Sequence, residues 1–352
     1  MTTELAFPKL GIELHLNRLA FSIGPLNVYW YGIIVVTGIL LGYFYANKRC
    51  NEFAVKKDSL SDYMLFSVVG GILGARIYYV AFKWDYYKEH LNEVFSIWKG
   101  GIAIYGGIIG ALIVILILSG IKKENPLNVT DCSVGGLILG QAIGRWGNFM
   151  NIEAFGSNTD SIFGMTSPAI TSYLESHMSE LAANGITVDP LAPVHPTFFY
   201  ESMWNLASFV IIMLLTKKRK FKGEITLLYL ALYGMGRSWI EGLRTDSLMW
   251  GSFRVSQVLA ILLTVSAAVI YFVMRKKQAD GTLSSYFAPD EPLHELSRKD
   301  KKKQEQAEEE KETAKEEAVD NQIDSSKEEN LENCEENSKT DENSEENRED
   351  QQ

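Results

Sequence analysis

The sequence predicts an all-α, polytopic membrane protein with seven transmembrane helices, a small extracytoplasmic head and a disordered acidic C-terminal tail. Seven apolar stretches lie between residues 28 and 274, and each is close to the ~20 residues that cross about 30 Å of hydrocarbon. The chain has a net charge of −10, but residues 1–277 are slightly basic and the acidic excess lies in residues 278–352. We therefore expect a membrane domain, residues 1–277, followed by a cytoplasmic tail, residues 278–352.

The predicted spans are preceded by a segment, residues 1–21, that mixes polar and apolar side chains and is expected to lie at the membrane surface. The first span begins with the aromatic cluster Tyr29-Trp30-Tyr31. Trp and Tyr favour the membrane–water interface, so this cluster is expected to lie there. The fourth span begins near Val134, and the other six cover about residues 28–46, 60–82, 101–120, 198–216, 225–243 and 255–274.

Glycines recur every four residues on three of these predicted helices. This spacing places the glycines on one helix face and lets a second backbone approach closely. We expect these faces to be helix contacts; they are formed by Gly70 and Gly74, by Gly106 and Gly110, and by Gly136, Gly140 and Gly144.

Basic residues gather in the loops that follow the first, third, fifth and seventh spans, most densely at residues 217–222. Because Lys and Arg favour cytoplasmic loops, the N-terminus is predicted to lie outside and the C-terminus in the cytoplasm. The odd number of predicted spans agrees with this orientation. The first residues lack the basic region, apolar core and small-residue site of a cleavable signal peptide.

Residues 149–198 contain no Lys or Arg and are predicted to form the extracytoplasmic head. Within them, Ser167-Pro168 has the pattern of an N-cap followed by proline at the first helical position. Apolar residues then recur at helical spacing, and Gly185 is the expected stop. This pattern predicts an amphipathic helix that packs on the bundle or lies on the lipid surface.

The acidic tail is rich in Glu, Lys, Gln, Asn and Ser and is too poor in apolar residues to form a core. We expect it to be disordered. The three cysteines of the chain are widely separated, and the five histidines show no ligand spacing. No disulfide or metal site is therefore predicted.

Polar side chains in six spans lie near one depth, the outer leaflet, whereas the inner halves of the spans are almost purely apolar. Charges inside a membrane are costly and usually mark a functional site. Arginines that converge at this depth suit a phosphate, because a guanidinium pairs with phosphate oxygens bidentately. Glu153, Glu201 and Glu241 are expected to orient arginines or to accept a proton. The polar residues of this layer are Tyr31, Arg76, Tyr105, Arg145, Asn148, Glu201, Arg237 and Glu241.

Two other classes of protein compete with an enzyme that acts on a lipid headgroup. A seven-span transporter of an anionic solute would place polar groups at the midplane or along a whole path. A scaffold that recruits partners through its acidic tail would leave the Arg, Asn and Glu side chains without a role. Polar groups confined to one depth favour the lipid enzyme.

One stretch resembles the signature of the prolipoprotein diacylglyceryl transferases, a family of bacterial inner-membrane enzymes: Gly144-Arg145-Trp146-Gly147-Asn148-Phe149-Met150-Asn151-Ile152-Glu153, extended by Gly156. The resemblance covers roughly residues 20–275, and the tail lies outside it. Further blocks match in the same order, namely Trp30-Tyr31-Gly32, Gly74-Ala75-Arg76, Gly106-Gly107, His195-Pro196, Tyr200-Glu201, and Tyr233-Gly234 through Arg237, Glu241 and Arg244.

The resemblance implies transfer of the diacylglyceryl group of phosphatidylglycerol to the lipobox cysteine thiol of prolipoproteins. A thioether forms and glycerol phosphate leaves, in the first step of lipoprotein maturation. The expected partners are phosphatidylglycerol, prolipoprotein signal peptides with a lipobox cysteine, and membrane lipid. No nucleic acid, metal or organic cofactor is expected. The expected location is the bacterial cytoplasmic membrane, with the active site facing the outer leaflet.

The candidate site combines the resemblance with the polar layer. Arg145 and Arg237 are expected to hold the phosphate before and during its departure, and Glu153 or Glu241 to orient an arginine. The residues expected to take part in catalysis are Arg145, Asn148, Glu153, Arg237, Tyr105 and Glu241. The residues expected to bind phosphatidylglycerol are Arg145, Tyr31, Asn148, Asn151, Gly156, Tyr233, Arg237 and Arg244.

The third span departs from the family pattern. Many members carry His-Gly-Gly at its start, and that histidine has been favoured as the general base, whereas this chain has Tyr105-Gly106-Gly107. A neutral tyrosine with a pKa near 10 is a poor base at neutral pH. Either cationic neighbours lower the pKa of Tyr105, or Tyr105 only donates a hydrogen bond and the base lies elsewhere; we prefer the second.

Three further polar residues have simpler interpretations. Arg76 either joins the site or is a structural partner of a glutamate. His195 precedes a proline and is expected to shape the loop rather than to bind a ligand. Arg237 and Glu241 are four residues apart on one helix face and can pair within the helix.

Overall fold

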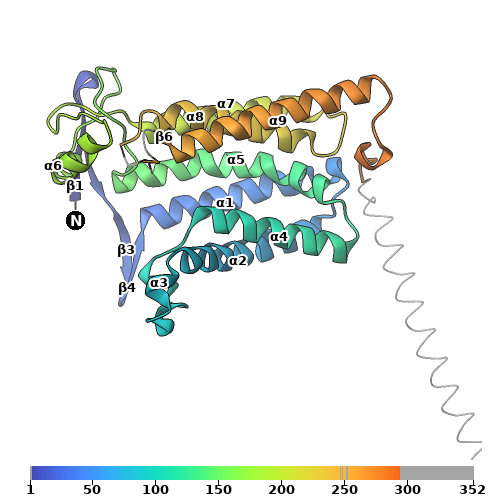
Figure 1. Ribbon diagram of the computed structural model, residues 1–352, viewed down its shortest axis with the longest axis horizontal. Coiled ribbons are helices and arrows are strands. Elements are labelled where there is room, and N and C mark those ends of the chain that lie inside the picture. Colours follow the sequence, from blue (N-terminus) through green and yellow to red (C-terminus); the bar gives the residue numbers. More distant parts are fainter. Residues whose placement is uncertain (1, 246, 248, 251–252, 294–352) are drawn as a thin grey trace, which may run out of the picture. The chain divides into compact units, whose positions relative to one another are not determined.

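Seven long helices lie side by side in the computed structural model, which describes residues 2–245, 247, 249–250 and 253–293 (Figure 1). Each overlaps one predicted span. The long helices are α1 (Trp30–Arg49), α2 (Lys57–Phe82), α4 (Ile104–Lys122), α5 (Pro126–Asn151), α7 (Thr197–Thr216), α8 (Glu224–Glu241) and α9 (Val255–Ala279). Two shorter helices are α3 (Trp84–Tyr87) and α6 (Pro168–Ala183).

Five of these helices are long and apolar enough to cross a membrane, namely α1 with the turn that follows it, α2, α4, α7 and α9. The protein is therefore a mostly helical, polytopic membrane protein. Helices α5 and α8 are of spanning length but are more polar, because they carry charged residues such as Asp131, Arg145, Arg237 and Glu241. The seven-span count stays a prediction.

Glycine faces bring helix backbones together, as the spacing predicted, although Gly144 of the predicted set faces open space. A Cβ atom at Gly42 of α1 would clash with the carbonyl oxygen of Gly136 in α5, and one at Gly74 of α2 would clash with that of Gly106 in α4. Helices α1 and α5 therefore form one close pair, and α2 and α4 form another.

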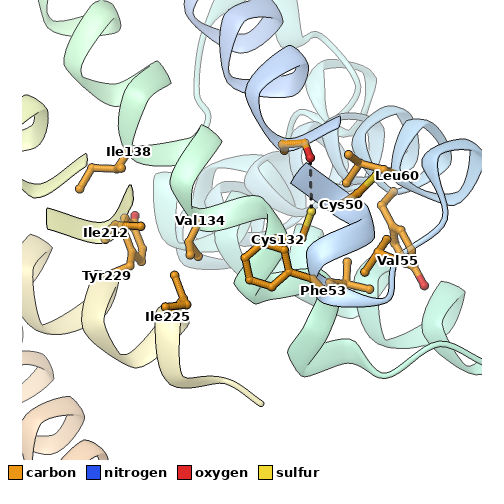
Figure 2. Packing of buried hydrophobic residues seen from close by; sticks show 13 residues of the cluster. Cys50, Phe53, Val55, Leu60, Cys132, Val134, Ile138, Ile212, Ile225 and Tyr229 are labelled. Carbon is orange, nitrogen blue, oxygen red and sulfur yellow. Dashed lines mark hydrogen bonds between the residues drawn. The ribbon is translucent and has the colours of Figure 1, made fainter. Parts of the chain in front are cut away.

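A core of apolar side chains joins the long helices at the end of the bundle away from α6 (Figure 2), which we call the far end. It connects α1, α2, α5, α7 and α8 through Ala46, Cys50, Phe53, Val55, Leu60, Tyr63, Val129, Cys132, Val134, Ile138, Ile212, Ile225 and Tyr229. Cys50 and Cys132 are buried in this core.

The other end of the bundle, the head end, carries α6 and short strands (Figure 1). Ser167 caps α6 by accepting a hydrogen bond from the Ala169 amide, and Pro168 is the first helical residue, as predicted. The strands pair as hairpins and were not predicted: β1 (Thr2–Phe7) with β2 (Ile12–Asn17), β3 (Leu19–Ile23) with β4 (Leu26–Tyr29), and β5 (Met249–Trp250) with β6 (Phe253–Arg254).

A second core holds α6 at the head end. Its buried members are Leu5 of β1 together with residues of the segment between α5 and α6, of α6, of the loop after α6 and of the start of α7, namely Ile152, Phe155, Met165, Ile170, Leu174, Leu181, Val194 and Phe198. The N-terminal segment, predicted only to lie at the membrane surface, thus contributes a strand to a packed core. Ala6 and Thr166 exchange backbone hydrogen bonds of 2.8 Å that fix β1 beside the loop before α6.

Two boundaries differ from those predicted. Helix α5 begins at Pro126, eight residues before Val134, because Asn125 caps it and proline occupies its first position. The compact unit also extends to Leu293, so residues 278–293 belong to the body. We call residues 282–293 the strap. The rest of the predicted disordered tail, residues 294–352, lies outside the described residues.

Candidate active site

The end of α5 supplies the first group of the candidate site. Arg145 donates a 3.2 Å hydrogen bond from Nη1 to the Asn148 side-chain oxygen. The ring of Tyr31, at the start of α1, lies against Gly147 so closely that a Cβ there would be 2.8 Å from it. Tyr31 therefore packs against the face of α5 that carries Gly147, because position 147 has no side chain.

Glu201, in the first turns of α7, is the centre of the site. Its carboxylate pairs with Arg145 of α5, with Arg237 of α8 at 2.9 Å, and with Arg244 after α8 at 3.4 Å. The side chain of Glu201 is only 6% exposed. One buried carboxylate thus draws three guanidinium groups from three segments to a single point.

Glu241 adds a second carboxylate to this group. It pairs with Arg237 one turn earlier in α8, and its side chain is 2% exposed. The pair lies within one helix, as its spacing indicated, but it is also connected to Glu201 through Arg237. Three arginines face two buried carboxylates, so the group keeps a net positive charge and favours an anion.

The turn after α5 brings Glu153 back to Asn148. The Asn148 side-chain nitrogen donates to Glu153 Oε1 at 2.8 Å, and that of Asn151 donates to the same oxygen at 3.4 Å. Ile152 and Ala154 both have positive φ, 51° and 56°, which is uncommon for residues with a Cβ and rare for a β-branched one. Ile152 tolerates this conformation because its side chain is buried in the second core, which holds α6 at the head end.

Gly156 lies where three segments of backbone meet. Its amide donates to the His195 carbonyl at 2.8 Å, and a Cβ there would be 2.7 Å from the Leu243 carbonyl oxygen. Gly156 also forms a bridge with Arg244. The chain that follows the signature is therefore fixed beside the segment that delivers Arg244 to Glu201.

His195 shapes the loop before α7, as its sequence context predicted. Nδ1 of His195 lies 3.2 Å from the Tyr200 hydroxyl, and its backbone bonds to Gly156 and Ser157. Burial lowers the pKa of His195. The neutral ring is therefore favoured beside the site.

The other two tyrosines of the candidate site, besides Tyr31, lie on different helices. Tyr233 is one turn before Arg237 in α8, stacks on Tyr229, and interacts electrostatically with Arg145, Arg237 and Tyr105. Tyr105 is the second residue of α4 and is 42% exposed. Its hydroxyl makes no hydrogen bond to any described residue.

Arg76 binds the loop between α2 and α4. Its guanidinium donates to the backbone carbonyls of Glu93, Val94, Gly100 and Gly101 at 2.6–2.8 Å, and it lies over the Tyr87 ring. Arg76 thus holds the loop between α2 and α4 in place. It does not join the group around Glu201.

Most candidate residues lie close together, but Glu201 has a larger role than the sequence indicated. It was expected to be one of three carboxylates that orient arginines, whereas it contacts three of them. Glu201 is the one charged residue of α7, so the sequence indicates that it needs a cationic partner but not how many arginines it contacts. No cluster of three His, Cys, Asp or Glu side chains that could hold a metal occurs among the described residues.

Comparisons with known proteins agree with this geometry. The family profile described as prolipoprotein diacylglyceryl transferase matches residues 18–273. Three relatives carry the name phosphatidylglycerol–prolipoprotein diacylglyceryl transferase. The relative from Listeria monocytogenes is 42% identical over 263 residues, which cover 74% of this chain and 91% of the relative. The one from Bacillus velezensis is 42% identical over 264 residues, which cover 74% of this chain and 93% of the relative. The one from Limosilactobacillus reuteri is 40% identical over 269 residues, which cover 76% of this chain and 94% of the relative. The chain belongs to the prolipoprotein diacylglyceryl transferase family.

Proposed function

We propose that this enzyme transfers the diacylglyceryl group of phosphatidylglycerol to the lipobox cysteine thiol of a prolipoprotein. The thiol sulfur attacks the glyceryl carbon that carries the phosphate, and the bond between that carbon and the phosphate oxygen breaks. A thioether forms and glycerol phosphate leaves with the bonding electron pair. The thiol proton passes to a basic group of the site.

The observation that carries this proposal is the convergence of Arg145, Arg237 and Arg244 on Glu201. Glu201 aligns the three guanidinium groups, and the net positive charge attracts the phosphate of the lipid. Negative charge grows on that phosphate as the bond breaks, so arginines already in place stabilise the transition state more than the ground state.

Glu153 is the proton acceptor that the geometry supports best. Glu241 is buried against Arg237, whereas Glu153 is exposed and is linked through Asn148 to Arg145. A free thiol has a pKa near 8.5, and nearby guanidinium groups lower it. Tyr105 is assigned a hydrogen bond to substrate rather than the role of base.

The setting that we propose is the bacterial cytoplasmic membrane. All seven long helices would span it, with the N-terminus and the head, residues 149–198, outside and the C-terminus in the cytoplasm. The arginine group then lies at the depth of the outer-leaflet headgroups, where a signal peptide can approach from the lipid. The transporter alternative is not favoured, because the family is named for a transferase.

Purified protein reconstituted with phosphatidylglycerol and a lipobox peptide tests the proposal. Wild type is expected to increase the peptide mass by one diacylglyceryl group. Arg145→Ala should abolish the gain, whereas Arg49→Ala, at the far end of α1, should retain it. Loss in Glu153→Gln with activity kept in Tyr105→Phe supports Glu153 as the acceptor. The absence of any gain with wild type would refute the transferase.

A further inference from the structure

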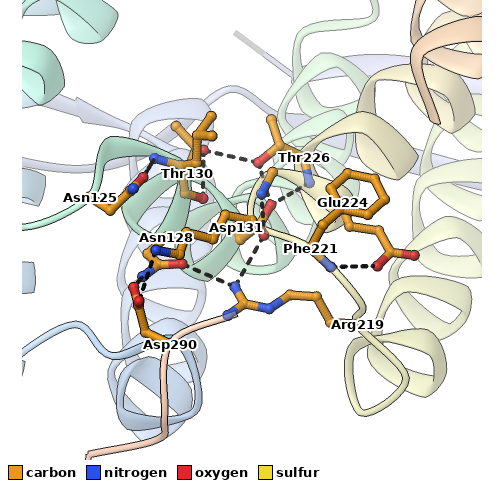
Figure 3. A network of polar contacts seen from close by, with 12 residues as sticks. Asn125, Asn128, Thr130, Asp131, Arg219, Phe221, Glu224, Thr226 and Asp290 are labelled. Atoms are coloured by element: carbon orange, nitrogen blue, oxygen red, sulfur yellow. Dashed lines mark hydrogen bonds and ion pairs between the residues drawn. The ribbon is translucent and has the colours of Figure 1, made fainter. Parts of the chain in front are cut away.

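A second polar network lies at the far end of the bundle (Figure 3), and most of its residues fall outside the predicted spans. Its centre is Asp131 of α5, whose side chain is fully buried. Oδ1 accepts the Thr226 amide and hydroxyl, each at 2.8 Å. Oδ2 accepts the Gly223 amide at 2.8 Å and pairs with Arg219 at 3.2 Å. The network is thus built around one carboxylate.

Two of these donors, Gly223 and Thr226, lie at the N-terminus of α8. Gly223 is the N-cap of that helix and offers no side chain to satisfy the first amides. Asp131 replaces the missing cap from another helix, and its negative charge also suits the positive end of the α8 dipole. A cap supplied by α5 fixes where α8 begins along α5, which a cap from the residues next to α8 in sequence could not do.

The two helices that Asp131 joins also carry the two central arginines. Arg145 lies roughly 20 Å further along α5, and Arg237 lies roughly 16 Å beyond Thr226 in α8. Between these ends, the Gln141 side-chain nitrogen donates to the Tyr229 hydroxyl at 3.1 Å. Stiff helices therefore transmit an axial shift at Asp131 to the spacing of the arginines.

Polar contacts determine register more sharply than apolar contacts do in a membrane. Apolar side chains pack against neighbouring helices or lipid tails with similar energy, so sliding one helix costs little. A slip of one turn moves α8 by about 5.4 Å. That distance breaks every hydrogen bond to Asp131, because such bonds extend over only about 3 Å.

We propose that Asp131 is a positioning residue: it sets the register of α8 against α5 and thereby the spacing between Arg145 and Arg237. It does not touch substrate. The inference builds on the proposed function in one respect, because the arginine spacing is expected to determine the affinity for phosphatidylglycerol.

The test compares Asp131→Asn with Ser133→Ala, a matched control in α5 whose hydroxyl donates only to the Val129 carbonyl of its own helix. Asparagine keeps the shape but removes the charge and one acceptor. We expect Asp131→Asn to raise both KM and the equilibrium Kd for phosphatidylglycerol at least ten-fold, while Ser133→Ala stays within two-fold. A role in stability alone would reduce the fraction of active protein and leave KM and Kd unchanged, and this result would overturn the proposal.

A distance measurement keeps the test independent of activity. Spin labels at Leu137 of α5 and Met235 of α8, both exposed, report the axial position of the two helices in a Cys334→Ser background. The inter-label distance should shift or broaden in Asp131→Asn and stay unchanged in Ser133→Ala. If wild type fails to transfer lipid, the proposed function fails, but the distance still decides the role of Asp131. An unchanged distance in Asp131→Asn contradicts it.

Discussion

At the scale of single residues, Glu201 decides the chemistry of the site because it holds three arginines that would otherwise repel one another. Glu201→Gln keeps the shape of the side chain but removes the charge that draws the three guanidinium groups together. We expect transfer activity to fall at least 100-fold, in line with the loss of an electrostatic element of an active site. The lipidation assay on the purified variant measures it.

The same substitution should also lower stability, because it leaves buried charges unpaired. Removing one partner of a buried ion pair costs about 3–5 kcal/mol. Glu52→Gln is the control: Glu52 pairs with Arg49 but its side chain is 47% exposed, so the cost should stay below about 1 kcal/mol. Equal melting temperatures for the two variants in detergent would contradict the buried character of the Glu201 group.

His195 gives the head end a dependence on pH. Burial lowers its pKa, so the unfolded chain takes up a proton more readily than the folded protein as the pH falls below about 6.5. This contribution to stability is complete above the unfolded pKa and is lost on acidification. The melting temperature should therefore fall more between pH 7 and pH 5 in wild type than in His195→Gln. Parallel profiles would show that His195 does not contribute.

At the scale of elements, the α5 signature combines two glycines with different roles. A Cβ at Gly147 would press on the Tyr31 ring, whereas one at Gly144 has open space within 4 Å. Gly147→Ala should displace Tyr31 and lower activity at least ten-fold, because an overpacked contact moves its neighbour. Gly144→Ala should retain activity. The lipidation assay distinguishes them, and similar activities would mean that Tyr31 is not held by this contact.

Elements with a strong local pattern could be predicted from the sequence. The apolar spans, the glycine faces and the Ser167-Pro168 start of α6 each depend on neighbouring residues only. The strands β1 to β4 were missed although they pair as local hairpins, and only the contact of β1 with Thr166 depends on a segment far along the chain. The early start of α5 was missed because Asn128 and Asp131 look polar for a span, although Asn125-Pro126 carried a cap signal.

At the scale of the whole described chain, polar clusters lie at both ends of the bundle rather than at one. The sequence indicated the head-end cluster, because arginines and glutamates inside apolar helices need partners. It could not indicate which carboxylate lies at the centre, since Glu201 meets residues 36 and 43 positions away. The far-end cluster depends on contacts of the same kind, between Asp131 and residues 88–95 positions away.

The strap extends this far-end cluster beyond the segment that the family profile matches. Asp290 pairs with Lys222 at 2.8 Å and accepts a hydrogen bond from Asn128 at 2.7 Å. The amide of Leu293 donates to the Asn51 carbonyl at 2.9 Å. Partial burial acts to raise the pKa of Asp290, but the hydrogen bonds from Lys222 and Asn128 outweigh it and lower that pKa. Asp290 is therefore charged at neutral pH.

Asp290→Asn should release the strap without harming the site. Its side chain is 44% exposed, so solvent screens the pair and the loss of stability should be no more than about 1 kcal/mol. The matched control is Glu291→Gln, an exposed neighbour of the same charge. Limited proteolysis should cut the strap faster in Asp290→Asn than in the control, and lipid transfer should stay near wild type. Equal cleavage rates would show that Asp290 does not hold the strap. A large loss of transfer would mean that the far end is coupled to the site through the strap as well as through Asp131.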